Sequence, residues 1–456
     1  MIVRIRPPLD LEKTLEILAL SSQPDGHAVK MFEKGFAARV NAARAIAVDR
    51  GRSALLLGLK ILGIKKGDEV IVQSYIFHAV IDAILEVGAH PVLADSSLGD
   101  FNIAPESIEN AITGRTKAIL VTHLGVPCDM EQISAIAGKH NCRLIENCAH
   151  TFGAECNGMV AGKFGDISFY SLDVDKPFST GDGGILVINN PDFIQNANDL
   201  LEKYRRVPLP QEEETVCGLV LHYLATSAKF YPQEGFLPVD FGKNAVKKDK
   251  RLLSVIKNGE IDKFDAHILP HLQKIQSSPK KTSWLSNKIS NALGIARMAL
   301  EKTPLLPKID TPYLLMNSLR SSVGAACLKD YDAIKNIRDR NANYYIDNLK
   351  TAAFKHPEIA PHKKTAFIRY AVLNETKYDN SWIRARAGEQ GFEIGIFNWS
   401  APVHLCYPYN KLLDFDRAKL QNSEQLGRKL LSLPVHPYLE EESLAKITRF
   451  LNGLAH

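Results

Sequence analysis

The sequence predicts an α/β fold with a mostly parallel central sheet and a smaller C-terminal α/β domain. Short β-branched runs alternate with amphipathic stretches between about residues 44 and 190, which is typical of βα units. The runs are apolar throughout, as expected of parallel strands that are covered on both faces. A chain of 456 residues is also long enough for more than one domain.

The predicted elements of the large domain follow one another in strict alternation. Strands are expected at residues 45–48, 69–72, 91–94, 118–121 and 143–145, and helices between them at 53–62, 79–87, 105–111 and 130–140. Two more strands are expected, at 167–170 and 184–188. The smaller unit is predicted to contain a helix over 321–349 and a strand over 367–372.

Four regions are expected along the chain: an N-terminal helical segment (1–35), the large domain (36–202), a mostly helical insertion (203–316) and a helix with the small domain (317–456). In the insertion the βα alternation stops and Lys, Pro and Ser increase. It holds an apolar-aromatic segment at 216–230 and a basic run at 247–251. The basic run is typical of a solvated face. The apolar segment fits core or dimer packing, or a surface that covers substrate or contacts a partner or membrane.

Composition restricts the function classes. The net charge of +5 is small for this length, which argues against a nucleic-acid partner. No apolar run approaches the roughly 20 residues of a transmembrane helix. The N-terminus lacks the layout of a signal peptide, so a cytoplasmic location is expected. The seven cysteines have irregular spacings and form no CxxC pair, so they predict neither a zinc site nor a disulfide framework.

Two features near the start of the large domain are candidates for ligand binding. Gly51-Arg52-Ser53-Ala54 joins a predicted strand to a predicted helix, where backbone N–H groups and a hydroxyl can bind an anion. A serine there can also be a simple N-cap. Phe77, after the strand at 69–72, could stack on a planar cofactor or belong to the core.

Two further features follow later strands. Asn147 and His150 come after the strand at 143–145, at the carboxyl end where ligands gather in such sheets. Asn147 could pair with a heterocycle nitrogen, or it could form a turn. Lys176 lies between a strand and the Gly-rich turn 181–184, so it is a candidate Schiff-base amine, although most loop lysines are merely exposed.

In this order, the features resemble the sugar-nucleotide aminotransferases of the DegT–StrS type. That family has a Gly-Thr/Ser-Ala phosphate loop, an aromatic pair after the second strand, an "IEDAAQ"-like segment and an "FSFYPTK" segment before a "GDGG"-like turn. Here the spacing from Gly165-Asp166 to Lys176 has no gap. Asn317 begins a segment similar to "NYRMSEIQAA", and Leu433-Pro434-Val435-His436-Pro437 resembles "LPLHP".

The resemblance implies the three-layer fold type I of pyridoxal 5′-phosphate (PLP) enzymes, which is that of aspartate aminotransferase. Lys176 would carry PLP as a Schiff base and then act as general base. The remaining assignments all concern cofactor contacts. Ser53, the Ala54 backbone and Ser171 would hold the phosphate, Phe77 would stack on the ring, Asn147 would face the ring nitrogen, His150 would lie near the cofactor, and Asn317 would reach the phosphate of a neighbouring subunit in a homodimer.

Three residues depart from the family pattern. Arg52 stands where the phosphate loop has Gly, and Asp173 stands where an aromatic residue or His is usual. Asn147 replaces the Asp that pairs with the pyridine nitrogen. Glu146 is a poor substitute for that carboxylate, because adjacent strand residues point to opposite faces.

The resemblance implies a cytoplasmic aminotransferase that moves an amine, from glutamate, to the keto group of a nucleotide-linked deoxysugar in polysaccharide or glycoside biosynthesis. Two alternatives stay open. One is a dehydratase or other PLP-dependent carbanion enzyme on the same fold. The other is a PLP-binding protein without transaminase turnover, which Asn147 favours and Lys176 disfavours. The sequence names neither the sugar nor the nucleotide.

Overall fold

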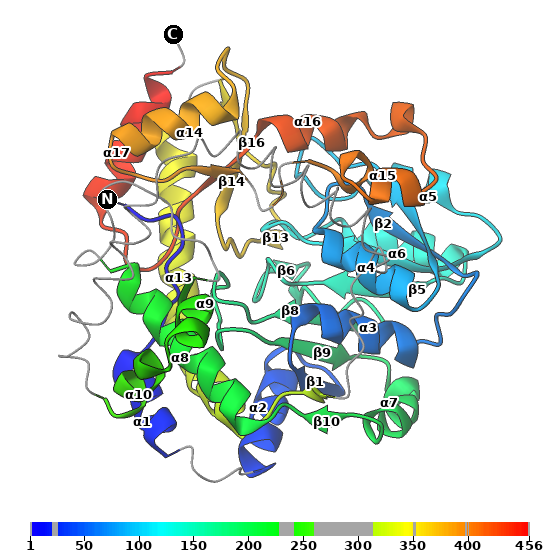
Figure 1. The fold of residues 1–456 in the computed structure, drawn as a ribbon. Coiled ribbons are helices and arrows are strands. Elements are labelled where there is room, and N and C mark those ends of the chain that lie inside the picture. Colours follow the sequence, from blue (N-terminus) through cyan, green and yellow to red (C-terminus); the bar gives the residue numbers. More distant parts are fainter. Residues whose placement is uncertain are drawn as a thin grey trace, which may run out of the picture.

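A computed structural model describes residues 2–20, 26–227, 241–259, 313–349, 353–396, 399 and 401–454. Within them a nine-stranded sheet runs in the order β10-β11-β1-β9-β8-β5-β4-β2-β3 (Figure 1). Its strands are β1 (Arg44–Val48), β2 (Glu69–Gln73), β3 (His90–Ala94), β4 (Thr116–Thr122), β5 (Arg143–Asn147), β8 (Ile167–Ser171), β9 (Gly184–Ile188), β10 (Arg205–Arg206) and β11 (Tyr313–Leu315).

The sheet is mostly parallel, as predicted. Strands β3, β2, β4, β5 and β8 run parallel to one another, and β9 lies antiparallel between β8 and β1. The connecting helices occur where the sequence predicts them. They are α3 (Gly51–Ile61), α4 (His78–Glu86), α5 (Pro105–Ala111) and α6 (Met130–Lys139). A further helix that was not predicted, α7 (Ile194–Leu201), follows β9.

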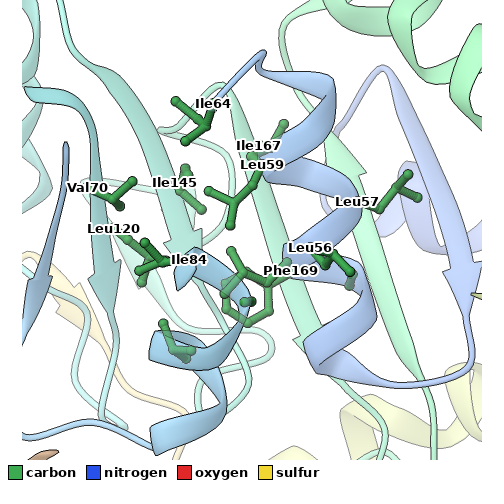
Figure 2. Close-up of a cluster of buried hydrophobic side chains, with 14 of the residues drawn as sticks. Leu56, Leu57, Leu59, Ile64, Val70, Ile84, Leu120, Ile145, Ile167 and Phe169 are labelled. Carbon is green, nitrogen blue, oxygen red and sulfur yellow. The ribbon is translucent and has the colours of Figure 1, made fainter. Parts of the chain in front are cut away.

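Helix α3 is held against the sheet by an apolar face. Leu56 and Leu59 pack with Ile145, Ile167 and Phe169 from the strands beneath, and these side chains are fully or almost fully buried (Figure 2). Burial of a leucine of this kind stabilises a fold by roughly 1.5–3 kcal/mol. This packing fixes where the first turn of α3 stands relative to the ends of the strands.

The small domain is a four-stranded antiparallel sheet, β12-β14-β16-β15, packed with three helices. The predicted strand at 367–372 is shifted: β14 begins at Tyr370, because Phe367 packs against Gly125 of the large domain instead. The elements are β12 (Phe354–Lys355), β14 (Tyr370–Asn374), β15 (Gly395–Ile396), β16 (Leu430–Leu433), α13 (Ser318–Asn348), α14 (Asn380–Glu389) and α17 (Glu441–Asn452).

Short elements complete the described chain. A three-stranded sheet, β13-β6-β7, links the two domains, because β13 comes from the small-domain part of the chain. Residue Ile2 bridges to Phe392, which ties the N-terminus to the small domain. These elements are α1 (Leu11–Ala19), α2 (Gly26–Arg39), β6 (Glu155–Cys156), β7 (Met159–Val160), β13 (Lys363–Lys364), α15 (Tyr409–Leu412), α16 (Gln421–Lys429) and the 3-10 turns Pro191–Phe193, Val403–Leu405 and Arg417–Lys419.

The segment 203–316 contributes both to the sheet and to a helical layer. Its ends form β10 and β11, while α8 (Leu209–Ala225), α9 (Phe241–Lys248) and α10 (Lys250–Lys257) lie beside α13 and α1 (Figure 1). Residues 228–240 and 260–312, including the end of the apolar-aromatic segment, lie outside the described part. Among the described helices, none combines the length and apolar character needed to cross a bilayer.

Candidate active site

A cavity of about 700 Å³ opens at the carboxyl ends of β5 and β8. This edge is where ligands bind in open α/β sheets. Five of the residues singled out from the sequence line it: Phe77, Asn147, His150, Ser171 and Lys176. Residues more than 90 positions apart in the chain therefore meet around one space, with contributions from both domains and from the segment 203–316.

The wall beside α3 is formed by Gly51 and Arg52. Ser53 and Ala54 are buried in the first turn of the helix and do not line the cavity. The Ser53 hydroxyl instead bonds to the Asp49 carboxyl. A Cβ on Gly51 would lie 3.0 Å from that of Ser171, so glycine is needed for this close approach of helix and strand. The helix start thus faces the cavity, where its N–H groups favour an anion.

Asn147 forms part of the floor with a fixed amide orientation. Its Oδ1 accepts the backbone N–H of Ala149 at 3.1 Å, so its Nδ2 must be the atom that donates to the Thr122 hydroxyl at 3.1 Å. One N–H of the Nδ2 group remains available beyond that bond. The amide can therefore donate to a neutral ring nitrogen, whereas a carboxylate could only accept from a protonated one.

Glu146 points away from the cavity, as the alternation of strand residues predicts. Its carboxylate accepts the N–H groups of Gly162 and Gly165, both at 2.7 Å, and pairs with His123 Nε2 at 3.1 Å. His123, Glu146 and Cys148 come close enough to suggest a metal site. These hydrogen bonds already give the carboxylate a structural role.

Aromatic rings form one side of the cavity. Phe77 is 47% exposed at the start of α4, so its ring is accessible to a ligand. Trp399 from the small domain lies 6.3 Å from Phe77 and 5.8 Å from His150, measured between ring centroids. Burial, with the charges of Lys176 and Arg369, lowers the pKa of His150 well below its ordinary value. The imidazole is therefore neutral at pH 7.

Lys176 is almost buried and stands in a network of charges. Its Nζ lies 3.3 Å from Asp175 Oδ1, and the other oxygen of Asp175 accepts from Arg369 at 3.0 Å. Burial alone would raise the pKa of Asp175, but the charges of Lys176 and Arg369 outweigh it and hold that pKa well below its usual range. Asp175 is thus an anion that links the lysine to the small domain.

A second carboxyl behaves differently. Asp173 lines the cavity, and burial together with repulsion from Asp182 and Asp175 raises its pKa to about 7. Asp182 is paired with Lys243 at 2.5 Å and lies 3.5 Å from Arg50. Burial opposes ionisation of Asp182, but these cations lower its pKa. The cavity thus holds carboxyl groups in different charge states at neutral pH.

Asn317 does not line the cavity of its own chain. It begins α13, where its Oδ1 accepts the N–H of Ser318 and its Nδ2 donates to the Val207 carbonyl at 2.9 Å. Its backbone N–H donates to Glu212. The described chain therefore uses Asn317 to cap a helix, and the predicted contact across a subunit interface stays a prediction.

Several cavity residues were not singled out from the sequence as ligand-binding. They are Arg4, Arg50, Asp175, Lys243, Lys247, Arg369 and Trp399. Only Arg369 carried a usable signal, because a charged residue in an otherwise apolar predicted strand needs a partner. The others lie in loops or in the segment 203–316, and only the folded chain brings them to this edge.

The profile of the DegT/DnrJ/EryC1/StrS aminotransferase family matches residues 10–216 and 313–452. The chain belongs to this family. The match leaves out residues 217–312, which contain the end of α8 and all of α9 and α10. This stretch therefore lies outside the part of the chain that the family profile describes.

Individual relatives agree with this assignment. A GDP-perosamine synthase of Escherichia coli O157:H7 is 42% identical over 166 residues, 36% of this chain and 46% of that relative. The "Pleiotropic regulatory protein" of Geobacillus stearothermophilus is 37% identical over 440 residues, 94% of this chain and 91% of that relative. For the GDP-perosamine synthase and several further curated relatives, this chain spans only about half of the relative's length.

The solved structures extend the likeness over the whole fold. An E. coli GDP-4-keto-6-deoxy-D-mannose-3-dehydratase with bound hydrated PLP superposes with a TM-score of 0.70 at 18% identity, covering 99% of both chains. This likeness establishes the fold, which is fold type I of the PLP enzymes. The prediction of the fold from the sequence is confirmed.

The raised pKa of Asp173 gives the cofactor-free protein a specific pH dependence. Between its ordinary value near 4 and about 7 the folded state keeps a proton that the unfolded state loses, so stability falls as pH rises. Asp173→Asn lacks this group. Its advantage over wild type in free energy of unfolding should grow by at least ~1 kcal/mol from pH 5 to pH 8. Urea denaturation at several pH values measures it, and a constant difference would contradict the assignment.

Proposed function

We propose that this protein is a PLP-dependent aminotransferase. It transfers an amine from glutamate to the keto group of a nucleotide-linked deoxysugar, in a pathway that makes polysaccharides or glycosides. The observation that carries the proposal is the almost buried Lys176, which faces a cavity at the carboxyl ends of β5 and β8 opposite the start of α3. Membership of the DegT/DnrJ/EryC1/StrS family and the likeness to a GDP-perosamine synthase support the substrate class.

The cavity residues fit PLP. Lys176 would bind it covalently, while Gly51, Arg52 and Ser171 would receive the phosphate at the α3 N-terminus. The assignment of the phosphate to Ser53 and the Ala54 backbone, which came from the sequence, stays a prediction; neither residue lines the cavity. On the other wall, Phe77, Asn147 and His150 would contact the ring. When bound, PLP supplies an electron sink for the carbon that carries the amine.

The chain's own residues supply orientation and proton transfer. Lys176 is the base placed to move a proton at its Nζ, and partial burial favours this role. Asp175 holds Nζ from one side and fixes its position through Arg369. His150 is neutral, so it can donate or accept a hydrogen bond without adding charge. The ring of Trp399 makes an edge-to-face contact with that of His150, with 5.8 Å between the centroids.

A homodimer in the cytoplasm is part of this proposal. The support is the similarity of the segment that begins at Asn317 to the corresponding family segment. In a dimer the partner's copy of this segment would reach the phosphate. The helix cap and the contact with Val207 keep Asn317 in one orientation at the start of α13.

One observation favours a second candidate function. The Geobacillus "Pleiotropic regulatory protein" matches almost the whole chain, so a regulatory PLP-binding protein without turnover is the alternative. Asn147 fits that alternative because a neutral amide does not stabilise a protonated ring nitrogen as a carboxylate does. The dehydratase likeness concerns the fold and does not separate the chemistries.

The first prediction of the proposed function tests the cofactor and the reaction together. Borohydride reduction of the PLP-loaded protein followed by peptide mapping should place a phosphopyridoxyl group on Lys176, and Lys176→Ala should abolish that label. Incubation with glutamate and a panel of keto-sugar nucleotides should then give an aminated sugar by mass spectrometry. Label without any aminated product would favour the regulatory alternative, while label that persists in Lys176→Ala would disprove the lysine assignment.

The second prediction concerns Asn147. Asn147→Asp keeps the contacts of the amide, because a carboxylate can accept both from the Ala149 N–H and from the Thr122 hydroxyl. A carboxylate raises the pKa of a nearby cationic group, and each unit corresponds to about 1.4 kcal/mol. The conversion of bound PLP to its amine form by glutamate, followed by absorbance, should therefore become at least about tenfold faster. A slower conversion with PLP still bound would indicate a mechanism designed around the neutral amide.

The third prediction concerns the dimer. Lys176→Ala and Asn317→Ala should each be inactive, and mixing them should restore part of the activity, because hybrid dimers contain one intact site. Sedimentation velocity should show dimers for the wild type and for both variants. Fully active wild-type monomers would contradict a shared site.

A further inference from the structure

We propose that α9 forms a diphosphate-binding wall, in which Lys243 and Lys247 recognise the diphosphate of the sugar nucleotide. This inference rests on the proposed function and deepens it, because it assigns the nucleotide end of the substrate to particular residues. The wall belongs to the stretch 217–312 that the family profile leaves out. Helix α9 therefore lies outside the part of the chain that the family profile describes.

Helix α9 presents one polar face to the cavity. Lys243, Asn244 and Lys247 line it, and positions 243 and 247 are one turn apart on the same side of a helix. The opposite face is apolar: Phe241, Ala245 and Val246 are buried against α8 and its neighbours. Packing thus fixes which side of α9 looks into the cavity.

Two glycines bring α9 close enough to take part. A Cβ on Gly242 would lie 1.9 Å from the Gly218 carbonyl oxygen, and one on Gly218 would lie 2.9 Å from the Lys243 backbone. The backbones of α8 and α9 therefore touch at this point. Here Lys243 reaches the Gly-rich turn after Lys176, where its Nζ lies 2.5 Å from Asp182 Oδ2. The lysine is anchored beside the reactive end of the cavity.

The charge of the cavity exceeds what the cofactor can neutralise. Seven cationic side chains and three carboxyl groups line it, but Lys176 would be bound to PLP and Asp173 is only partly ionised at neutral pH, so the remaining excess is three to four positive charges. A phosphate monoester carries about −1.5 to −2 at pH 7, so roughly two positive charges are left over. A diphosphate diester carries two negative charges and matches this remainder. The cationic residues are Arg4, Arg50, Arg52, Lys176, Lys243, Lys247 and Arg369.

The cationic side chains of the cavity come from several elements, among them α3 and α9. Arg52 stands at the α3 N-terminus, the part of the cavity suited to the cofactor phosphate. Lys247 is exposed, so it can reach a ligand that enters from solvent. Like charges one turn apart destabilise a helix, and an anion held between Lys243 and Lys247 relieves that repulsion. The α9 lysines are therefore suited to the second anionic group, the diphosphate.

The test compares two neighbouring lysines of α9 in the PLP-loaded protein. Lys247→Ala and Lys247→Glu remove or reverse the proposed contact. Lys248→Ala is the matched control, because Lys248 is also exposed on α9 but is not among the residues that line the cavity. Uridine, guanosine and thymidine diphosphate are titrated calorimetrically, and PLP content is followed by absorbance.

The dissociation constant of the nucleotide that binds wild type best should rise roughly fivefold in Lys247→Ala, and further in Lys247→Glu. In Lys248→Ala it should stay within about twofold. The proposal is overturned if Lys247→Ala binds like Lys248→Ala, if it loses PLP instead of nucleotide, or if wild type binds no nucleoside diphosphate. Turnover of keto-sugar nucleotides with no effect of Lys247 would refute only the wall. Diphosphate binding that depends on Lys247, without turnover, would refute only the aminotransferase.

Discussion

The ion pairs of the largely buried Asp175 carboxylate are the interaction on which the arrangement of the site depends. The carboxylate lies between Lys176 of the large domain and Arg369, which immediately precedes the first residue of β14 in the small domain. Removing one partner from such a buried pair costs about 3–5 kcal/mol, because the other charge is left uncompensated. The same carboxylate thus positions the amine of Lys176 and links the small domain to the cavity wall.

Charge in this cavity is arranged by burial as much as by residue type. Three neighbouring carboxyls differ because Asp175 and Asp182 each have cationic partners, whereas Asp173 mainly faces other acids. Burial and the nearby charge of Lys176 lower the pKa of His150, so its imidazole is neutral. Asn147 introduces no charge at all. The walls of the cavity therefore carry an excess of positive charge, whereas its floor is neutral. This combination suits an anionic ligand that contains a planar ring.

The cavity is lined both by residues that the family profile matches and by residues of the stretch that it leaves out. The shared part supplies the sheet edge, the start of α3 and Lys176, all of which border the cavity. Helices α8 and α9 close one side with Thr215, which the family profile still matches, with Leu219, and with Lys243 and Lys247, two of the three lysines of α9. Membership in the family thus accounts for the reacting end of the site. Lys243 and Lys247 lie in the stretch 217–312 that the family profile leaves out.

The sequence by itself determined the α/β class, the order of strands and helices in the large domain, and five of the residues around the cavity. It could do so because apolar periodicity and short motifs are local properties. Tertiary structure decided the rest. Ser53 and Ala54 turn inward while Gly51 and Arg52 face the cavity, which depends on how α3 packs on the sheet. Arg369 and Lys243 reach Asp175 and Asp182 across 194 and 61 positions of chain, and only packing sets such long-range distances.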